Sequence, residues 1–341
     1  MLARKRLVGL FVLLALLFLG IAGSIVFGSR PIPLSTFPAI INNFPAMFDS
    51  SAPKSVEEQV VFELRVPRTF LALLAGAALG VAGALIQGHT RNPLADPGIL
   101  GINAGAALAV VLSSTLFSVT SMWATSLWAF SGAIAATAAV FALATIGKGS
   151  STSITLVLGG AALASILTSI TSAFILTDNS DLNRMRFWTV GSVAGRDMSI
   201  VYGILPFVTV GLVVALMTGP QLNALNLGDD IAASLGINTR LARITGMALI
   251  AVLAGAATAG AGPLGFIGLI VPHAIRTIVG PDYRWILPYS ALAGAVLLLA
   301  ADVAGRLAAR PAEMQVGIVL AFIGAPLFIA LIVRRKTVKL S

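Results

Sequence analysis

The sequence predicts an all-α membrane protein with about ten transmembrane helices. Three observations support this: 57% of the 341 residues are hydrophobic, only 10% are charged, and the mean hydropathy is +0.97. Soluble domains carry about 25% charged residues, so the composition excludes a soluble protein. Cysteine is absent, which excludes disulfides and thiolate metal sites.

Apolar runs define the predicted spans within one polytopic domain over residues 1–341. A helix needs about 20 mostly apolar residues to cross the hydrocarbon core, and only the eighth run is clearly short of that. The first run follows Arg4-Lys5-Arg6 and is longer than the apolar core of a signal peptide, so we expect a retained span. The runs are 7–28, 67–87, 98–117, 122–146, 153–177, 199–218, 243–261, 264–279, 286–305 and 315–333.

Charge in the connecting segments sets the predicted orientation. With the N-terminus inside, the inner loops hold most of the 22 Lys and Arg residues and few of the 13 acidic ones. The positive-inside rule therefore places both termini in the cytoplasm. The net charge of +9 then reflects topology and gives no reason to expect nucleic-acid binding.

The sequence contains an internal repeat. Leu74-Ala75-Gly76-Ala77-Ala78 recurs as Leu253-Ala254-Gly255-Ala256-Ala257, in two spans that are predicted to run in opposite directions. An inverted repeat of this kind is expected where a pathway forms between two related halves. Chance matching between helices rich in Ala and Gly is the alternative.

The stretch 65–105 contains the most specific sequence motif. An arginine pair and an apolar run lead into the turn Asn92-Pro93-Leu94-Ala95-Asp96-Pro97, which is too polar and too broken for the bilayer core. This motif resembles the FecCD-type permeases, the membrane subunits of ABC importers for ferric siderophores, haem and cobalamin. The resemblance extends over nearly the whole chain. The resemblance implies the fold of a type II ABC importer permease.

The resemblance also implies a substrate and partners. We expect transport of a ferric siderophore across the bacterial cytoplasmic (inner) membrane, with haem or cobalamin as the alternative substrate. The pathway would form with a second permease subunit, either a copy in a homodimer or a paralogue in a heterodimer. Two ATPase subunits and an extracytoplasmic substrate-binding protein complete the expected assembly.

We expect no cofactor on this chain, because ATP and Mg²⁺ would bind to the partner ATPase subunits. The G-x-G-x-x-G pattern at 260–265 lies between two spans, whereas a dinucleotide site follows a strand. Gly147-Lys148-Gly149 lacks the upstream glycine and the following Ser or Thr of a Walker A loop. The sequence thus predicts a transport subunit that hydrolyses no ATP.

Three arginines are candidates for docking the binding protein. Arg65 and Arg68 lie three residues apart at the outer start of the second span, and Arg306 lies at the outer end of the ninth. Single interfacial arginines commonly snorkel toward lipid headgroups, which is the alternative. In the family, arginines at the matching places receive acidic side chains of the binding protein.

The loop 219–242 is the longest predicted cytoplasmic connection. We expect a turn or cap at 225–230, then a short helix through Leu235 that Gly236 ends. A solvated connector is the alternative, but in the family this segment forms coupling helices that insert into a groove of the ATPase. The residues that would carry this role are Leu227, Gly228, Asp229, Asp230, Ala233, Leu235 and Gly236.

Gate candidates follow from the same resemblance. In the family, a Thr-Ser pair before the fifth span and the Asn and Leu of Asn-Pro-Leu form narrow cytoplasmic gates; simple helix capping is the alternative for the hydroxyls. An outer gating segment matches the stretch with Trp188 and Gly191, where Trp188 as an interfacial anchor is the alternative. The cytoplasmic gate candidates are Asn92, Leu94, Thr152 and Ser153.

Two other function classes fit the sequence less well. An ion-coupled secondary carrier needs an embedded acid, and Asp302 is the sole reasonable candidate; a pair with Arg306, four residues on, explains that acid more simply. A membrane enzyme needs a nucleophile and a base, and no such couple occurs. His89 and His273 are the only histidines and are far apart in sequence, so we expect no metal site.

Overall fold

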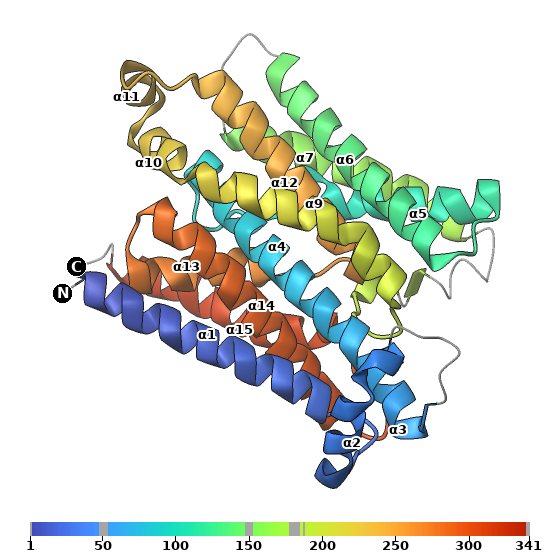
Figure 1. Ribbon diagram of the computed structural model, residues 1–341. Helices are drawn as coiled ribbons and strands as arrows, with labels where there is room; N and C mark the ends of the chain where they lie inside the picture. Colours follow the sequence, from blue (N-terminus) through green and yellow to red (C-terminus); the bar gives the residue numbers. More distant parts are fainter. Residues whose placement is uncertain (1, 48–53, 147–152, 177–184, 187, 339–341) are drawn as a thin grey trace.

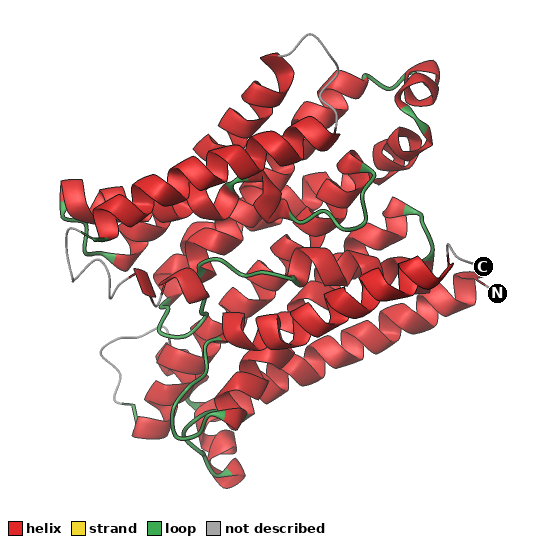
Figure 2. Ribbon diagram, turned by 180° about the vertical axis from the view of Figure 1, so that it is seen from behind, coloured by secondary structure: helices red, strands yellow, loops and turns green. Residues whose placement is uncertain are grey.

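A computed structural model describes residues 2–47, 54–146, 153–176, 185, 186 and 188–338. This part of the chain is a bundle of helices joined by short loops, and no strand occurs in it (Figures 1 and 2). The helices are α1 (Leu2–Val26), α2 (Phe37–Asn42), α3 (Val56–Gln59), α4 (Val66–Thr90), α5 (Ile102–Phe117), α6 (Met122–Ile146), α7 (Ser153–Ile175), α9 (Met198–Met217), α10 (Gly219–Leu227), α11 (Asp229–Ser234), α12 (Thr239–Ala261), α13 (Ile267–Val279), α14 (Tyr283–Ala308) and α15 (Val316–Val338).

Each of the ten predicted spans contains one apolar helix of the bundle. Among the described residues, seven helices are long and apolar enough to cross a membrane, and three shorter apolar helices account for the remaining spans. The shortest, α13, has 13 residues, which gives about 20 Å at 1.5 Å per residue. That is less than the hydrocarbon thickness of about 30 Å, so helical structure covers only part of the predicted span 264–279.

Helix α13 is short because the chain before it cannot continue the helix α12. Gly262 has a φ of +75°, a conformation that L side chains rarely adopt. Pro263 follows and has no backbone N–H to donate to a helical hydrogen bond. Residues 262–265 are therefore non-helical, and this break accounts for Gly262, the second glycine of the G-x-G-x-x-G pattern.

Helices α4 and α12 lie at the centre of the bundle (Figure 1). They are the most buried of the candidate spans, and Leu71, Leu85, Ile250 and Leu253 have no exposed surface. Small residues let α4 approach its neighbour α14: a Cβ on Gly294 would lie closer than 3.0 Å to the carbonyl oxygen of Gly76. Close backbone contact of this kind is how helices associate in lipid, where apolar burial gives little driving force.

The two ends of the bundle carry different features. The start of α1 and the end of α15 lie at the same end as α10 and α11, and we call this end the terminal side (Figures 1 and 2). Helices α2 and α3 lie at the other end, the opposite side. Arg91, just after α4, and Arg243, near the start of α12, both pair with Asp229. The two helices therefore run in opposite directions, as an inverted repeat requires, while the repeat itself stays a prediction.

The contact between α4 and α14 leads to a prediction about stability. Gly294→Ala places a methyl group against the backbone of Gly76, so the helices must move apart, at a cost of about 1–3 kcal/mol. We expect a lower thermal unfolding midpoint for this variant in detergent. The matched control is Gly159→Ala on α7, where an added Cβ meets no atom within 4 Å; equal midpoints for the two variants would contradict the assignment.

Candidate functional site

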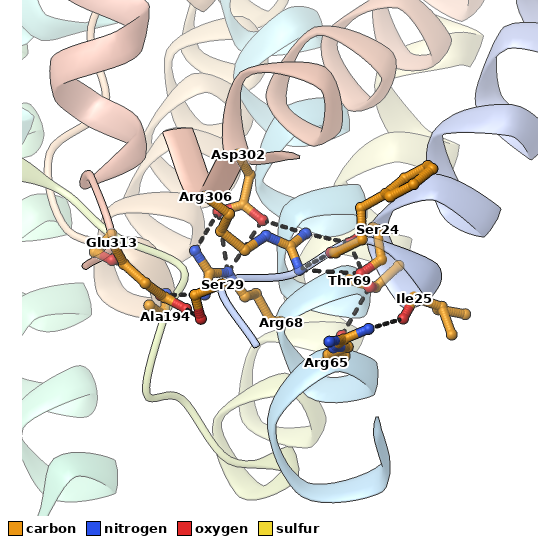
Figure 3. A network of polar contacts seen from close by, with 12 residues as sticks. Ser24, Ile25, Ser29, Arg65, Arg68, Thr69, Ala194, Asp302, Arg306 and Glu313 are labelled. Carbon is orange, nitrogen blue, oxygen red and sulfur yellow. Dashed lines mark hydrogen bonds and ion pairs between the residues drawn. The ribbon is translucent and has the colours of Figure 1, made fainter. Parts of the chain in front are cut away.

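The opposite side holds a cluster of charged side chains, which we call the charged network. Figure 3 shows Arg65, Arg68, Asp302, Arg306 and Glu313, and Arg310 joins them at the carbonyl of Gly28. At its centre, Arg306 Nη2 lies 2.8 Å from Asp302 Oδ2 on α14. Asp302 has no exposed surface and Arg306 is 1% exposed. The predicted pair between residues four apart on one helix face is confirmed.

Arg68 at the start of α4 joins this pair from across the bundle. Its Nε donates to both Asp302 oxygens at 3.0 Å, and its Nη2 donates to Oδ1 at 2.8 Å. The remaining Nη1 donates to Glu313 Oε2 at 2.6 Å. Asp302 thus compensates two buried arginines at once, a contact that the sequence analysis did not foresee.

Three arginines of the network bind the end of α1. Arg65, Arg306 and Arg310 donate to backbone carbonyls at 2.6 to 3.0 Å. A helix end leaves its last carbonyls without intrahelical partners and is favoured by nearby cations, so the arginines cap α1. The acceptors are the carbonyl oxygens of Ser24, Ile25, Val26, Phe27, Gly28 and Arg30.

The three docking candidates therefore come together, but inside the protein. Arg65 is 3% exposed and Arg68 is 7% exposed, and both bind protein groups instead of extending toward lipid headgroups. The members of the network that reach the surface are Arg310 and Glu313, which the sequence analysis missed. Arg310 lies four residues after Arg306, just beyond the end of α14, and this spacing is a signal that could have found it; Glu313 lies beyond Pro311 and had none.

Glu313 is ionised at neutral pH. Burial raises the pKa of its carboxyl group, but the hydrogen bond and charge of Arg68, together with the hydroxyl of Ser29, outweigh this and hold the pKa below its ordinary value. Its two oxygens accept from Arg68 and, at 2.8 Å, from Ser29. Glu313 therefore adds a negative charge at the surface of a cluster that is otherwise rich in arginine.

On the terminal side, the loop 219–242 folds as two short helices. Helix α11 begins after Gly228, where φ is +126°, and the chain turns again at Gly236, where φ is +82°. This confirms the predicted cap, the short helix and its end. Helix α10 was not predicted, although Pro220 in its first turn is a common helix-start signal.

Asp229 joins this loop to the ends of two central helices. Its carboxylate pairs with Arg91, which closes α4, and with Arg243 near the start of α12. Arg91 also donates from Nε to the carbonyl of Leu225 at 2.8 Å. Because Arg91 directly precedes Asn92, its side chain joins α11 to the start of the turn 92–97.

Side chains fix the turn 92–97 itself. Asn92 Oδ1 accepts from the N–H of Leu94 at 3.0 Å, and Asp96 Oδ1 accepts from Gly98 at 2.8 Å. Burial raises the pKa of Asp96, and the Gly98 bond opposes this in part. Thr152 lies outside the described residues, and Ser153 opens α7 with no described side chain. The cytoplasmic gate therefore stays a prediction.

A basic cavity opens beside this turn. It has a volume of about 350 Å³ and contains the Arg276 guanidinium, which donates to Gln87 Oε1 at 3.3 Å and to the Tyr283 hydroxyl at 3.2 Å. No acidic side chain lines the cavity, so its field favours anionic groups. Within the described residues, no group of three or more His, Cys, Asp or Glu could hold a metal ion. The lining residues are Gln87, Arg91, Pro93, Asn226, His273, Arg276, Thr277, Pro281 and Tyr283.

The predicted outer gating segment packs between α12 and α15. Trp188 is 7% exposed, which argues against the alternative of an interfacial anchor. Gly191 has a φ of +77° and accepts a hydrogen bond from the N–H of Gly317 at 3.2 Å, while Ser192 donates to Ala261 at 2.7 Å. A Cβ at Gly191 would lie closer than 3.0 Å to the Pro263 carbonyl. The segment thus contacts the non-helical break before α13, and its role as a gate stays a prediction.

The charged network generates a second prediction about stability. Asp302→Asn leaves Arg68 and Arg306 buried without their shared carboxylate, which costs about 3–5 kcal/mol. We expect a large fall in the thermal unfolding midpoint. The matched control is Glu63→Gln, which removes an exposed carboxylate paired with Lys54 at 3.3 Å; it leaves one lysine without its partner instead of two buried arginines, so it should cost less. Similar midpoints for both variants would show that the network contributes little.

The chain is similar to permease proteins of known transport systems. The chain is 42% identical over 325 residues to the ferric enterobactin transport system permease protein FepD of Escherichia coli (strain K12), covering 95% of this chain and 94% of that one. It is 39% identical to the hemin transport system permease protein HmuU of Yersinia pestis, covering 80% and 83% of the two chains.

A solved structure described as an inward-facing conformation of a metal-chelate type ABC transporter superposes with a TM-score of 0.81 and 28% identity. The match covers 95% of this chain and 98% of that chain. The model of the FecCD transport family matches residues 13–334. From this match over nearly its whole length, the chain belongs to the FecCD transport family.

Proposed function

We propose that this chain is the membrane permease subunit of an ATP-driven importer for ferric siderophore complexes. It forms the translocation pathway together with a second permease subunit, a copy or a paralogue. ATP and Mg²⁺ bind to two partner ATPase subunits, and an extracytoplasmic substrate-binding protein delivers the chelate. The terminal side faces the cytoplasm, in agreement with the positive-inside distribution of Lys and Arg.

The observation that carries this proposal is the attachment of α11 to both central helices through Asp229. A protein that docks on α10 and α11 pushes on the end of α4 and the start of α12 through Arg91 and Arg243. The turn 92–97 follows Arg91 directly, so the same push reaches the gate candidates Asn92 and Leu94. Energy from a partner ATPase can thus be converted into movement of the pathway wall.

Helix α7 supplies a wall suited to a pathway. It is exposed along most of its described length, and Ser165, Ser169 and Ser172 lie exposed on one face of it. Polar side chains within a membrane normally face a bundle interior or a water-filled cavity. The exposed serine face therefore supports a position against the second permease subunit and the chelate path.

The charged network supports docking of the substrate-binding protein on the opposite side, but with exposed residues making the first contacts in place of the buried arginines. The buried arginines give that surface a positive field, and Arg310 and Glu313 are the members that a partner meets first. Salt should weaken such docking, because interactions between exposed charges are screened within about 10 Å at 0.1 M ionic strength.

The substrate proposal rests on similarity to the ferric enterobactin permease. Haem remains the second candidate, because the hemin permease is nearly as similar, and cobalamin remains a third. An ion-coupled carrier has no structural support: the carboxylate of Asp302 is taken up by its ion pairs with Arg68 and Arg306 and is not free for a transported ion.

Transport should depend on the complete assembly. We expect proteoliposomes with this permease, its ATPase and its binding protein to take up radiolabelled ferric enterobactin only with ATP and Mg²⁺, and to take up hemin more slowly. Omission of the ATPase should abolish uptake. Uptake driven by a proton gradient alone would contradict the proposal, and a preference for hemin would replace the siderophore by haem.

A single carboxylate tests the coupling. Asp229→Asn removes the charge that Arg91 and Arg243 share, and we expect ATP-driven uptake to fall about tenfold or more while the ATPase still binds. Exposed ion pairs contribute only about 0.2–1 kcal/mol each to the free energy of unfolding, so the variant should remain folded. Arg240→Gln is the control in the same loop, because Arg240 is exposed, belongs to none of the ion pairs among the described residues and is not one of the coupling candidates. Equal uptake by the two variants would remove Asp229 from the coupling path.

A further inference from the structure

The Arg68 guanidinium divides its donors between two carboxylates. Its Nε and Nη2 face Asp302 at 2.8 to 3.0 Å, and its Nη1 faces Glu313 at 2.6 Å (Figure 3). Every nitrogen of this guanidinium therefore has a carboxylate partner. Because Arg68 is only 7% exposed, an acidic side chain from another protein can reach it only if one of the two carboxylates moves away.

The two carboxylates differ in how easily they can leave. Asp302 has no exposed surface and also pairs with Arg306 at 2.8 Å, so its departure would strand two buried charges. The Glu313 side chain is 36% exposed, and its other contact is the hydroxyl of Ser29 at 2.8 Å. Water can solvate Glu313 once it is released, whereas Asp302 has no access to water. Glu313 is therefore the replaceable partner.

The position and charge of Glu313 suit such an exchange. It lies in the connection between α14 and α15, where residues 310–313 are exposed on the opposite side. The network holds four arginines and two carboxylates. Release of Glu313 uncovers Arg68 and leaves Asp302 as the only carboxylate on Arg68, Arg306 and their neighbours, which strengthens the local attraction for an incoming acid.

We propose that Glu313 is an internal substitute for a docking carboxylate: it occupies Arg68 in the free permease and is displaced when an acidic side chain of the substrate-binding protein arrives. This inference rests on the proposed docking of that protein at the charged network. Glu313 then lowers the affinity for the partner, because docking must first break an existing ion pair. The Glu313 carboxylate also compensates the charge of Arg68 between transport cycles.

The test compares two carboxylates on the same side of the protein. The full importer in lipid nanodiscs is titrated with the binding protein of the reconstituted uptake assay, loaded with ferric enterobactin, at low ionic strength. We expect Glu313→Gln to bind the partner about two- to fivefold more tightly than wild type, the range of an exposed ion pair. Glu63→Gln is the matched control, because it removes the same charge from an exposed side chain that pairs with Lys54 and not with Arg68.

A second variant guards against a loss of folding in Glu313→Gln. Ser29→Ala removes the other hydrogen bond of Glu313 and leaves the ion pair in place, so it should tighten docking by a smaller factor. Thermal unfolding midpoints of all variants show whether the network remains folded. Tighter binding by Glu313→Gln and Ser29→Ala, but not by Glu63→Gln, supports the exchange.

The opposite results separate the two proposals. If Glu313→Gln and Ser29→Ala bind no more tightly than Glu63→Gln, Glu313 only fixes the connection between α14 and α15, and the exchange is overturned. Arg310→Glu tests the docking surface itself, since it reverses an exposed charge of the network. If Arg310→Glu binds the partner with wild-type affinity, docking at this surface is overturned. If Arg310→Glu binds the partner more weakly and Glu313→Gln binds it with wild-type affinity, only the exchange is overturned.

Discussion

Backbone carbonyls inside an apolar bundle need hydrogen-bond partners, and this requirement explains where the protein places many of its few charged side chains. Water cannot satisfy these groups within a bilayer. Arg65, Arg306 and Arg310 cap the end of α1. On the terminal side of the bundle, Arg6 donates from Nε and Nη2 to the carbonyl of Val279, the last residue of α13, at 3.1 and 2.9 Å.

Once these guanidinium groups are buried as helix caps, their charges need compensation, and Asp302 provides it for two arginines at once. At the terminal side, one side chain again satisfies several partners: Gln87 donates from Nε2 to the carbonyls of Gly268 and Leu269, at 3.2 and 3.1 Å, and accepts from Arg276. Polar side chains thus satisfy carbonyls at the ends of α1 and α13 and in the first turn of α13, where Pro272 has no N–H to offer Gly268, while glycine contacts hold α4 against α14.

Local patterns account for what the sequence could predict. The length of an apolar run is enough to place a span, so all ten coincide with helices, and spacing by four is enough to pair Asp302 with Arg306. The partnership of Arg68 with Asp302 joins residues that lie far apart in the chain, and no local pattern encodes it. The burial of Arg65 also depends on α1, which comes from another part of the sequence. The exposed residues Arg310 and Glu313 were missed because their importance arises only from that assembled network.

Helix α4 carries Arg68 in its first turn and is followed directly by Arg91, with 25 continuous helical residues between its ends, about 37 Å at 1.5 Å per residue. It acts as a single stiff rod, and both of its ends are tied to charged contacts that we assign to different partners. Thermodynamic linkage then requires reciprocity. If a bound ATPase displaces the rod and so changes the affinity for the binding protein, the binding protein must change the affinity for the ATPase by the same factor.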